Sequence, residues 1–389
     1  MDTSRLQIRW KMRLGGLIAL VLGLSATTTA ATPLSVALVP PQDYEPTLAQ
    51  LTAIGKAMGI TVTQLTPAEL VNAAAFNAAN YPLAVYTGRE RYCYTVDKPG
   101  DGASALLRYV REGGVLLVAG LCWPFYRPVD YVNGEWVASQ GELPEFAADA
   151  DEHLRRQMER LNQSAVGNFN RYIGLNISGE GTTQFESPEE PVTLRRNTNT
   201  ELTFGLPEQF EFPAQGDLRY RPVSARHGMP QARFVPIVTA FGDSGNEYGP
   251  GIAVVTREPQ EGRRGTVIYV WGTFMSTRHA PGIVREVIRL AARESATSED
   301  RARVADLTGK LQGMVDASTA LQKTLTDAPD TTPALTYLRR QTDHVAEALR
   351  QLQDTIVVRS FGPAERSLTG LDDTLQRLEG RVAGLVAGR

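Results

Sequence analysis

One stretch of sequence decides the fold: YVREGGVLLVAG, residues 109–120. It closes an expected helix over residues 104–112, in which the apolar side chains recur at helical spacing. Gly113 and Gly114 end that helix, because glycine leaves helical geometry without a steric cost. The apolar run that follows, residues 115–119, is typical of a strand buried on both faces.

The same alternation of helix and strand extends back towards the N-terminus. We expect strands over residues 34–39, 60–65, 83–86 and 115–119, and helices over 44–58, from 66, and over 104–112. Thr66 and Glu69 are spaced as in a capping box. This order predicts right-handed crossovers and a parallel sheet with helices on both faces. Because ligands bind at the carboxyl ends of such strands, we expect a site in the loops after Val39, Tyr86 and Ala119.

The second half of this region is less regular and predicts a mixed insertion. Residues 121–226 are rich in loops, with a charged helix expected over 147–161 and β-structure with turns over 190–212. Strands follow over 234–240, 251–256 and 266–271, the first two joined by a hairpin turn at GDSG, residues 242–245. A helix over 281–292 would close the α/β domain, which we expect to span residues 33–294.

Residues 297–389 have a different pattern. Leucine and other apolar residues alternate three and four apart in three segments, separated by DAPD (327–330) and FGP (361–363). Short loops within one chain favour an antiparallel three-helix bundle, or a helical hairpin with a third arm. A coiled coil that self-associates with other copies is the alternative.

The N-terminus predicts export. Arg5, Arg9, Lys11 and Arg13 precede a short apolar run, residues 14–24, and then small residues, which together predict a signal peptide over residues 1–31. The working protein would then be periplasmic or extracellular, and an uncleaved membrane anchor is the alternative for this segment. The net charge of −3 and the lack of a basic block give no reason to expect a nucleic-acid partner, and the four histidines show no metal-ligand spacing.

The stretch 109–120, with the strand-helix order around it, resembles the class I glutamine amidotransferase-like superfamily over residues 33–294. The resemblance implies a flavodoxin-like α/β core and, in active members, a Gly-x-Cys-x-Gly nucleophile elbow after the fourth strand. The sequence at that point is GLCWP, residues 120–124, so Cys122 stands at the nucleophile position but Pro124 replaces the closing glycine. His279 follows the late strand without a glutamate at the matching spacing.

The two cysteines allow several roles. Cys122 with His279 as its base would give a thiol hydrolase or amidotransferase-like enzyme. In an oxidising compartment, Cys93 and Cys122 could instead form a disulfide, since both follow strands of the same sheet. Two free, partly buried thiols are the remaining alternative.

Ligand recognition without catalysis is the function that these departures from the enzyme pattern favour. Candidate ligand-binding residues lie beyond the strand ends: Trp123, Tyr126, Tyr131, Arg89 and Arg91. Aromatic side chains there could bind a sugar ring or simply cover the end of the sheet. We therefore expect an exported recognition or assembly protein of the cell envelope, with a carbohydrate or another envelope component as partner, no cofactor, and self-association through the C-terminal helices.

Overall fold

The computed structural model describes residues 34–88, 91–120, 125, 127–139, 173–176, 183–225, 232–257, 265–328 and 332–387. All of these belong to one compact unit, Pro33–Arg389. The predicted signal peptide over residues 1–31 and the predicted charged helix over 147–161 lie outside the described residues.

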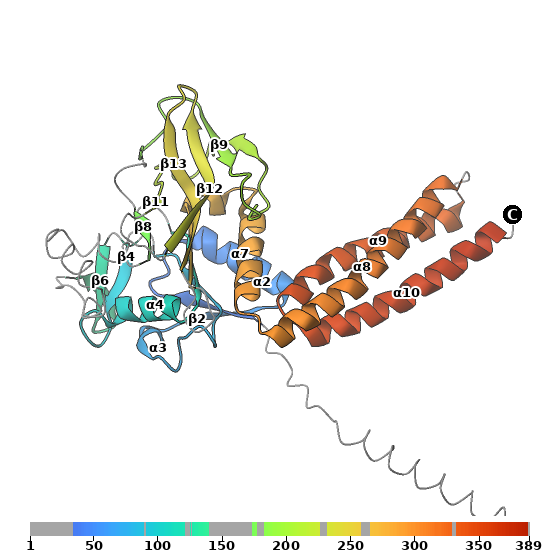
Figure 1. Cartoon of the computed structure of the whole chain (residues 1–389), viewed down its shortest axis with the longest axis horizontal. Coiled ribbons are helices and arrows are strands. Elements are labelled where there is room, and N and C mark those ends of the chain that lie inside the picture. Colours follow the sequence, from blue (N-terminus) through green and yellow to red (C-terminus); the bar gives the residue numbers. More distant parts are fainter. Residues whose placement is uncertain are drawn as a thin grey trace, which may run out of the picture. The chain divides into compact units, whose positions relative to one another are not determined.

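The described chain contains a nine-stranded sheet in the order β10-β9-β12-β13-β14-β5-β3-β1-β2 (Figure 1). Its parallel half consists of β1 (Ser35–Val39), β2 (Thr61–Gln64), β3 (Leu83–Tyr86), β5 (Val115–Val118) and β14 (Thr266–Val270). The order of these five strands is that of flavodoxin, so the predicted flavodoxin-like α/β class is confirmed.

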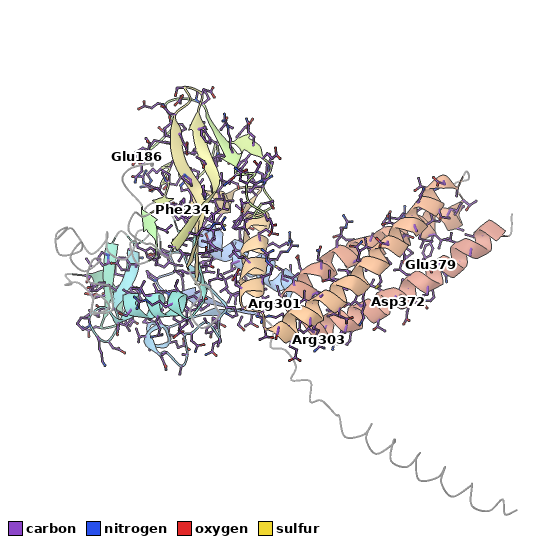
Figure 2. All side chains as sticks on the ribbon, viewed as in Figure 1. Glu186, Phe234, Arg301, Arg303, Asp372 and Glu379 are labelled. Carbon is purple, nitrogen blue, oxygen red and sulfur yellow. The ribbon has the colours of Figure 1, made fainter. Side chains whose placement is uncertain are left out.

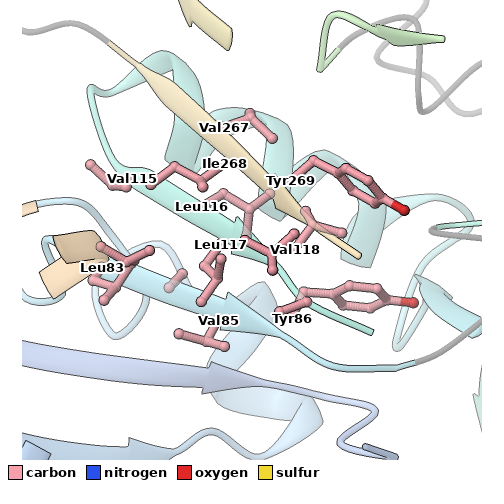
Figure 3. Close-up of a cluster of buried hydrophobic side chains, with 14 of the residues drawn as sticks. Leu83, Val85, Tyr86, Val115, Leu116, Leu117, Val118, Val267, Ile268 and Tyr269 are labelled. Carbon is pink, nitrogen blue, oxygen red and sulfur yellow. The ribbon is translucent and has the colours of Figure 1, made fainter. Parts of the chain in front are cut away.

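The centre of the core lies where β3, β5 and β14 run side by side. Leu83 and Thr266 both pair with Val115, and the three strands are almost wholly buried. Figure 3 shows their apolar side chains packed together, with Tyr86 and Tyr269 at the carboxyl ends of β3 and β14. Uninterrupted apolar strands of this kind occur where helices cover both faces of a sheet.

Helices cover the sheet in two sets. Helix α2 (Glu45–Met58) packs against α7 (Ala280–Glu294), and α3 (Pro67–Val71) packs against α4 (Asp101–Arg111), as right-handed crossovers on opposite faces require. The predicted capping box at Thr66 and Glu69 begins α3, and Gly59 ends α2 in a left-handed conformation.

The other half of the sheet is antiparallel. It contains β9 (Val192–Arg196), β10 (Gln209–Glu211), β12 (Ala232–Gly242) and β13 (Glu247–Arg257), with β13 joining it to β14. The predicted hairpin at residues 242–245 joins β12 to β13. Glu190 fastens this hairpin, because its carboxylate accepts hydrogen bonds from the Ser244 amide (2.6 Å), the Ser244 hydroxyl (2.8 Å) and the Tyr248 hydroxyl (2.5 Å).

These bonds predict a local sensitivity to acid. Hydrogen bonds from Tyr248 and then from Ser244 lower the pKa of Glu190 to about 2. A carboxyl group whose pKa is lower in the folded protein stabilises it above the unfolded pKa, and this contribution disappears as the pH falls from about 5 towards 2. We expect the urea midpoint of wild type to fall more steeply over that range than that of Glu190→Gln. The exposed neighbour variant Glu189→Gln should follow wild type, and identical slopes for all three proteins would contradict the assignment.

The structure also contains a small second sheet that the sequence pattern does not predict. Strand β4 (Arg91–Thr95) pairs in parallel with β6 (Arg127–Val132), which forms a hairpin with β7 (Glu135–Ala138). The sequence predicts Arg91 in a loop after the third strand, and that prediction is wrong, because Arg91 is the first residue of β4. A two-stranded pair, β8 (Leu175–Asn176) with β11 (Ser224–Ala225), lies in the insertion as well.

The C-terminal helices form the predicted bundle. Helices α8 (Ser298–Asp327), α9 (Pro333–Val357) and α10 (Phe361–Ala387) each pack against the other two. Thr297 and Asp300 form a capping box at the beginning of α8. The residues at the heptad positions are buried, as the three-four alternation predicts: Leu307, Leu311, Met314, Leu321 and Leu325 in α8, and Leu335, Leu338, Val345, Leu349 and Leu352 in α9.

Candidate functional site

The candidate site lies at the carboxyl edge of the parallel strands, where the strand order reverses between β1 and β3. The loop after β1 contains Asp43, whose amide donates to the carbonyl of Thr87 after β3 (3.3 Å). Arg91 binds the Asp43 carboxylate through both arms of its guanidinium group, at 2.9 Å and 2.7 Å. The two loops of the switch point are thus held together by a bidentate ion pair.

Neighbouring elements are fastened to the same edge. The Thr47 hydroxyl, in the first turns of α2, donates to the carbonyl of Ala119 after β5 (2.8 Å), and both residues are buried. Tyr44 lies with its hydroxyl 3.2 Å from the hydroxyl of Ser276, at the end of the 3-10 helix η3 (Gly272–Ser276). The ends of β1, β3, β5 and β14 therefore form one connected edge.

Two hydroxyl groups at this edge have no hydrogen-bond partner among the described residues: Tyr86 Oη and Thr87 Oγ1. Both side chains are fully buried, with an exposed fraction of 0%. A buried polar group without a partner costs about 1–3 kcal/mol, and such groups are rare in native proteins. These hydroxyls therefore require a partner that the described chain does not supply.

Three other buried tyrosines have their hydroxyls paired. Tyr220 donates to the carbonyl of Gly249 (2.7 Å), and Tyr269 donates to the carbonyl of Arg221. Tyr109 lies within hydrogen-bond distance of two carbonyl groups. These three hydroxyls are paired, whereas Tyr86 Oη has no hydrogen-bond partner among the described residues.

Aromatic rings pack against Tyr86. The Phe125 ring stacks on it at 4.4 Å, and Tyr92 meets Phe125 edge to face at 5.8 Å. Phe125 has φ 57°, a left-handed conformation that is strained for a bulky side chain. Asp130 on β6 interacts electrostatically with Tyr92, and its Oδ1 atom is buried without a partner in the described part of the chain.

Burial is the main cause of the pKa shifts of Tyr86 and Cys93. It raises the pKa of Tyr86 well above the ordinary value, with a further contribution from the Asp43 charge, so the phenol stays protonated and can donate a hydrogen bond. Burial also raises the pKa of the Cys93 thiol, which packs against Gly102 at the beginning of α4. A protonated, buried thiol is a poor nucleophile.

Gly88 closes the turn between Thr87 and Arg91. A Cβ atom on Gly88 would lie 2.7 Å from the Tyr86 hydroxyl and 2.6 Å from the Arg91 carbonyl oxygen. No side chain fits there, so the glycine is required by the close approach of the loop to the Tyr86 ring.

The predicted site residues fall into two groups. Cys122, Trp123, Tyr126 and Arg89 lie outside the described residues. Cys93 carries a free thiol in the structure, so the Cys93–Cys122 disulfide is not seen, and it stays a prediction because Cys122 is not described. Of the predicted ligand-binding residues, Arg91 lies at the candidate site, whereas Tyr131 packs its ring against Trp136 across the β6–β7 hairpin at 4.8 Å.

His279, the predicted partner of Cys122, comes directly before α7. Its ring lies 5.0 Å from the ring of Phe210 on β10, in the antiparallel half of the sheet. Partial burial and the neighbouring Arg278 charge lower its pKa, so the imidazole is neutral at pH 7. The pairing of His279 with Cys122 stays a prediction.

Sequence reasoning missed Asp43, Thr47, Tyr86, Thr87 and Asp130 as site residues. Tyr86 does end a predicted strand at the expected edge, and Thr87 begins the loop after it. The alternating run RYCYT, residues 91–95, is the signal of a strand that could have been recognised. Nothing in the sequence shows that the Tyr86 hydroxyl lacks a partner among the described residues, because its surroundings include Phe125 and Tyr92, which are distant in sequence.

The fold and this edge define the class of protein: an α/β protein with a flavodoxin-like parallel half, extended by an antiparallel half and a helical bundle. Its sequence matches no protein-family model and no curated protein. Among the described residues, no group of three or more histidine, cysteine or acidic side chains is placed to bind a metal ion. None of the described helices combines the length and the apolar character needed to cross a membrane.

Proposed function

We propose that this is an exported, non-catalytic recognition protein of the cell envelope, related to the class I glutamine amidotransferase-like superfamily, which binds a small polar ligand such as a sugar at the carboxyl edge of β3. The single observation that supports this best is the pair of buried hydroxyls on Tyr86 and Thr87, which have no hydrogen-bond partner among the described residues. Hydroxyl groups beside aromatic rings are among the groups that bind sugar hydroxyls and the apolar C–H faces of a sugar ring.

The absence of catalysis has its own support. The described thiol, Cys93, is buried and protonated. The sequence GLCWP replaces the small residue that a nucleophile elbow needs after Cys122. Recognition requires neither an activated nucleophile nor a general base.

The test measures both ligand binding and the free energy of unfolding for the same variants. The purified protein is screened against immobilised muropeptides, N-acetylglucosamine oligomers, and neutral and acidic hexose oligomers. For a glycan that binds, Tyr86→Phe and Thr87→Val should each weaken binding about tenfold, because each removes a hydrogen bond worth about 1.4 kcal/mol. Without ligand, neither variant should lower the free energy of unfolding, since neither hydroxyl has a partner to lose in the part of the chain that the structure describes.

Thr47→Val is the matched control. Its hydroxyl is equally buried but donates to the Ala119 carbonyl, so its loss should destabilise the protein by about 1 kcal/mol. A screen in which no glycan binds would refute the sugar ligand. Destabilisation by Tyr86→Phe as large as that by Thr47→Val would show that the Tyr86 hydroxyl is already satisfied, and would remove the basis of the site.

A further inference from the structure

The ion pair of Asp43 and Arg91 lies directly beside the two buried hydroxyls of the candidate site. The Asp43 amide donates to the Thr87 carbonyl (3.3 Å), and the Arg91 amide donates to the Gly88 carbonyl (2.8 Å). A Cβ atom on Gly88 would lie 2.6 Å from the Arg91 carbonyl oxygen and 2.7 Å from the Tyr86 hydroxyl oxygen, so both oxygens are close to one point. The charges of this pair therefore belong to the surroundings of any ligand bound there.

The Asp43 carboxylate occupies the part of the Arg91 guanidinium group that an acidic ligand would use. Nε and Nη2 of Arg91 donate to its two oxygens at 2.9 Å and 2.7 Å, and this fork is the geometry that binds carboxylates and phosphates. The Asp43 side chain is 19% exposed, against 43% for that of Arg91. An acidic ligand would have to displace the less exposed partner and leave its charge unpaired, which costs free energy. A neutral ligand leaves the pair intact.

The two charges of the pair do not cancel at the Tyr86 hydroxyl. After burial, the Asp43 charge is the largest cause that raises the pKa of Tyr86, and the Arg91 charge lowers it by less. The carboxylate therefore has the stronger influence on this hydroxyl. Arg89 and Glu90, which lie outside the described residues, carry opposite charges and leave the sum unchanged. A neutral hydroxyl or carbonyl group of a ligand can bind the Tyr86 hydroxyl, whereas an anionic group would be repelled there.

We propose that Asp43 makes the site selective for neutral glycans, because it occupies Arg91 and so excludes ligands that carry a carboxylate or a phosphate group. This selectivity rests on the proposed function, since it concerns the ligand bound at Tyr86 and Thr87. Oligomers of neutral hexoses and of N-acetylglucosamine fit such a site, and uronate oligomers do not. Asp43 is then a specificity-determining residue, and Arg91 contributes to the site through its contact with Asp43.

Equilibrium binding to matched glycans tests this selectivity. The purified full-length exported protein is titrated with neutral hexose oligomers and with the corresponding uronate oligomers, in which a hydroxymethyl group is oxidised to a carboxylate. Wild type should bind the neutral oligomer about tenfold more tightly or better. Asp43→Asn removes the counter-charge of Arg91 but keeps an acceptor, so the ratio of the two dissociation constants should shift about tenfold towards the uronate. Asp43→Glu, which keeps the charge, should keep the preference for the neutral oligomer.

Three further variants separate the charge from the link between the two loops. Arg91→Gln leaves the Asp43 carboxylate without its counter-charge and should shift the ratio further towards the neutral oligomer. The double variant Asp43→Asn with Arg91→Gln has no ion pair but the same net charge as wild type, so its ratio should return to the wild-type value. Glu379→Gln makes the same charge change as Asp43→Asn on the bundle helix α10, where Figure 2 shows this side chain, and should leave the ratio unchanged.

The possible outcomes distinguish the selectivity from the site itself. If wild type binds the uronate as tightly as the neutral oligomer, or if Asp43→Asn leaves the ratio unchanged, the role of Asp43 is refuted. The ligand site would survive that result as long as Tyr86→Phe still weakens glycan binding. A wild type that binds none of these oligomers would refute the sugar ligand and the selectivity together.

Discussion

Replacing Gly114 by alanine is expected to destabilise the protein by about 3 kcal/mol, a larger loss than we expect from substitutions at Asp354 or Thr47. A Cβ atom at position 114 would lie 2.3 Å from Cζ of Tyr109. The Tyr109 ring has nowhere to move, because it is fully buried and stacks on Phe76 at 4.6 Å. Its hydroxyl lies 2.8 Å and 3.0 Å from the carbonyl oxygens of Tyr81 and Val115.

Urea unfolding followed by circular dichroism measures this effect. Gly309→Ala is the matched control, since the added methyl group meets open space on a helix and should stabilise the protein by up to about 1 kcal/mol. The two alanine substitutions should therefore shift the urea midpoint in opposite directions. A loss below 1 kcal/mol for Gly114→Ala would mean that the Tyr109 ring can be displaced, contrary to its packing.

The glycine pair at 113–114 shows how far the sequence can be interpreted. The sequence pattern assigns both glycines to ending the helix before β5. In the structure the two glycines have different roles: Gly113, with φ +92°, turns the chain, and Gly114 leaves space for the Tyr109 ring. The turn could be predicted because it is local, whereas the contact with a ring five residues earlier depends on how the helix meets the strand.

The parallel half of the sheet could be predicted for the same reason. Apolar runs, the Gly59 helix end and the Thr66 capping box are local patterns, and the crossover rule then limits the topology. Strand β4 could not be placed in this way, because it leaves the main sheet and pairs with β6, whose residues come more than thirty positions later. The candidate site includes residues of that second sheet, so the main contacts of the site could not be predicted from the sequence.

The Asp43–Arg91 ion pair is a contact that the sequence does not predict. Both residues are charged and both follow predicted strands, yet 48 positions separate them in sequence. The sequence predicts that Arg91 binds a ligand, and the structure shows its guanidinium group holding two loops of the switch point together. A sequence pattern can predict which edge of a sheet carries a site, but the ion pairs across that edge depend on the geometry of the loops.

A second charge cluster joins the bundle to α7. The Asp354 carboxylate, on α9, accepts two hydrogen bonds from Arg289, at 3.0 Å and 2.6 Å, and lies 2.9 Å from Nε of Arg285. Its side chain is only 13% exposed. Close by, the amide of Leu34 donates to the carbonyl of Val358, which is buried in the main core. The last turn of α9 is thus fastened to the α/β core by polar and apolar contacts together.

Removing this carboxylate should have the second largest effect. Asp354→Ala would remove the carboxylate that Arg285 and Arg289 share, while Arg289 would keep its ion pair with Glu286. We expect the free energy of unfolding to fall by about 2 kcal/mol. This is less than for a fully buried pair, because both arginines are partly exposed. Asp354→Asn, which keeps one acceptor but no charge, should lose about half as much. Glu347→Ala removes an exposed ion pair with Arg350 on the same helix and should cost less than about 0.5 kcal/mol. If urea unfolding gives equal losses for Asp354→Ala and Glu347→Ala, the cluster does not hold α9 to α7, and the apolar contact at Val358 must do so alone.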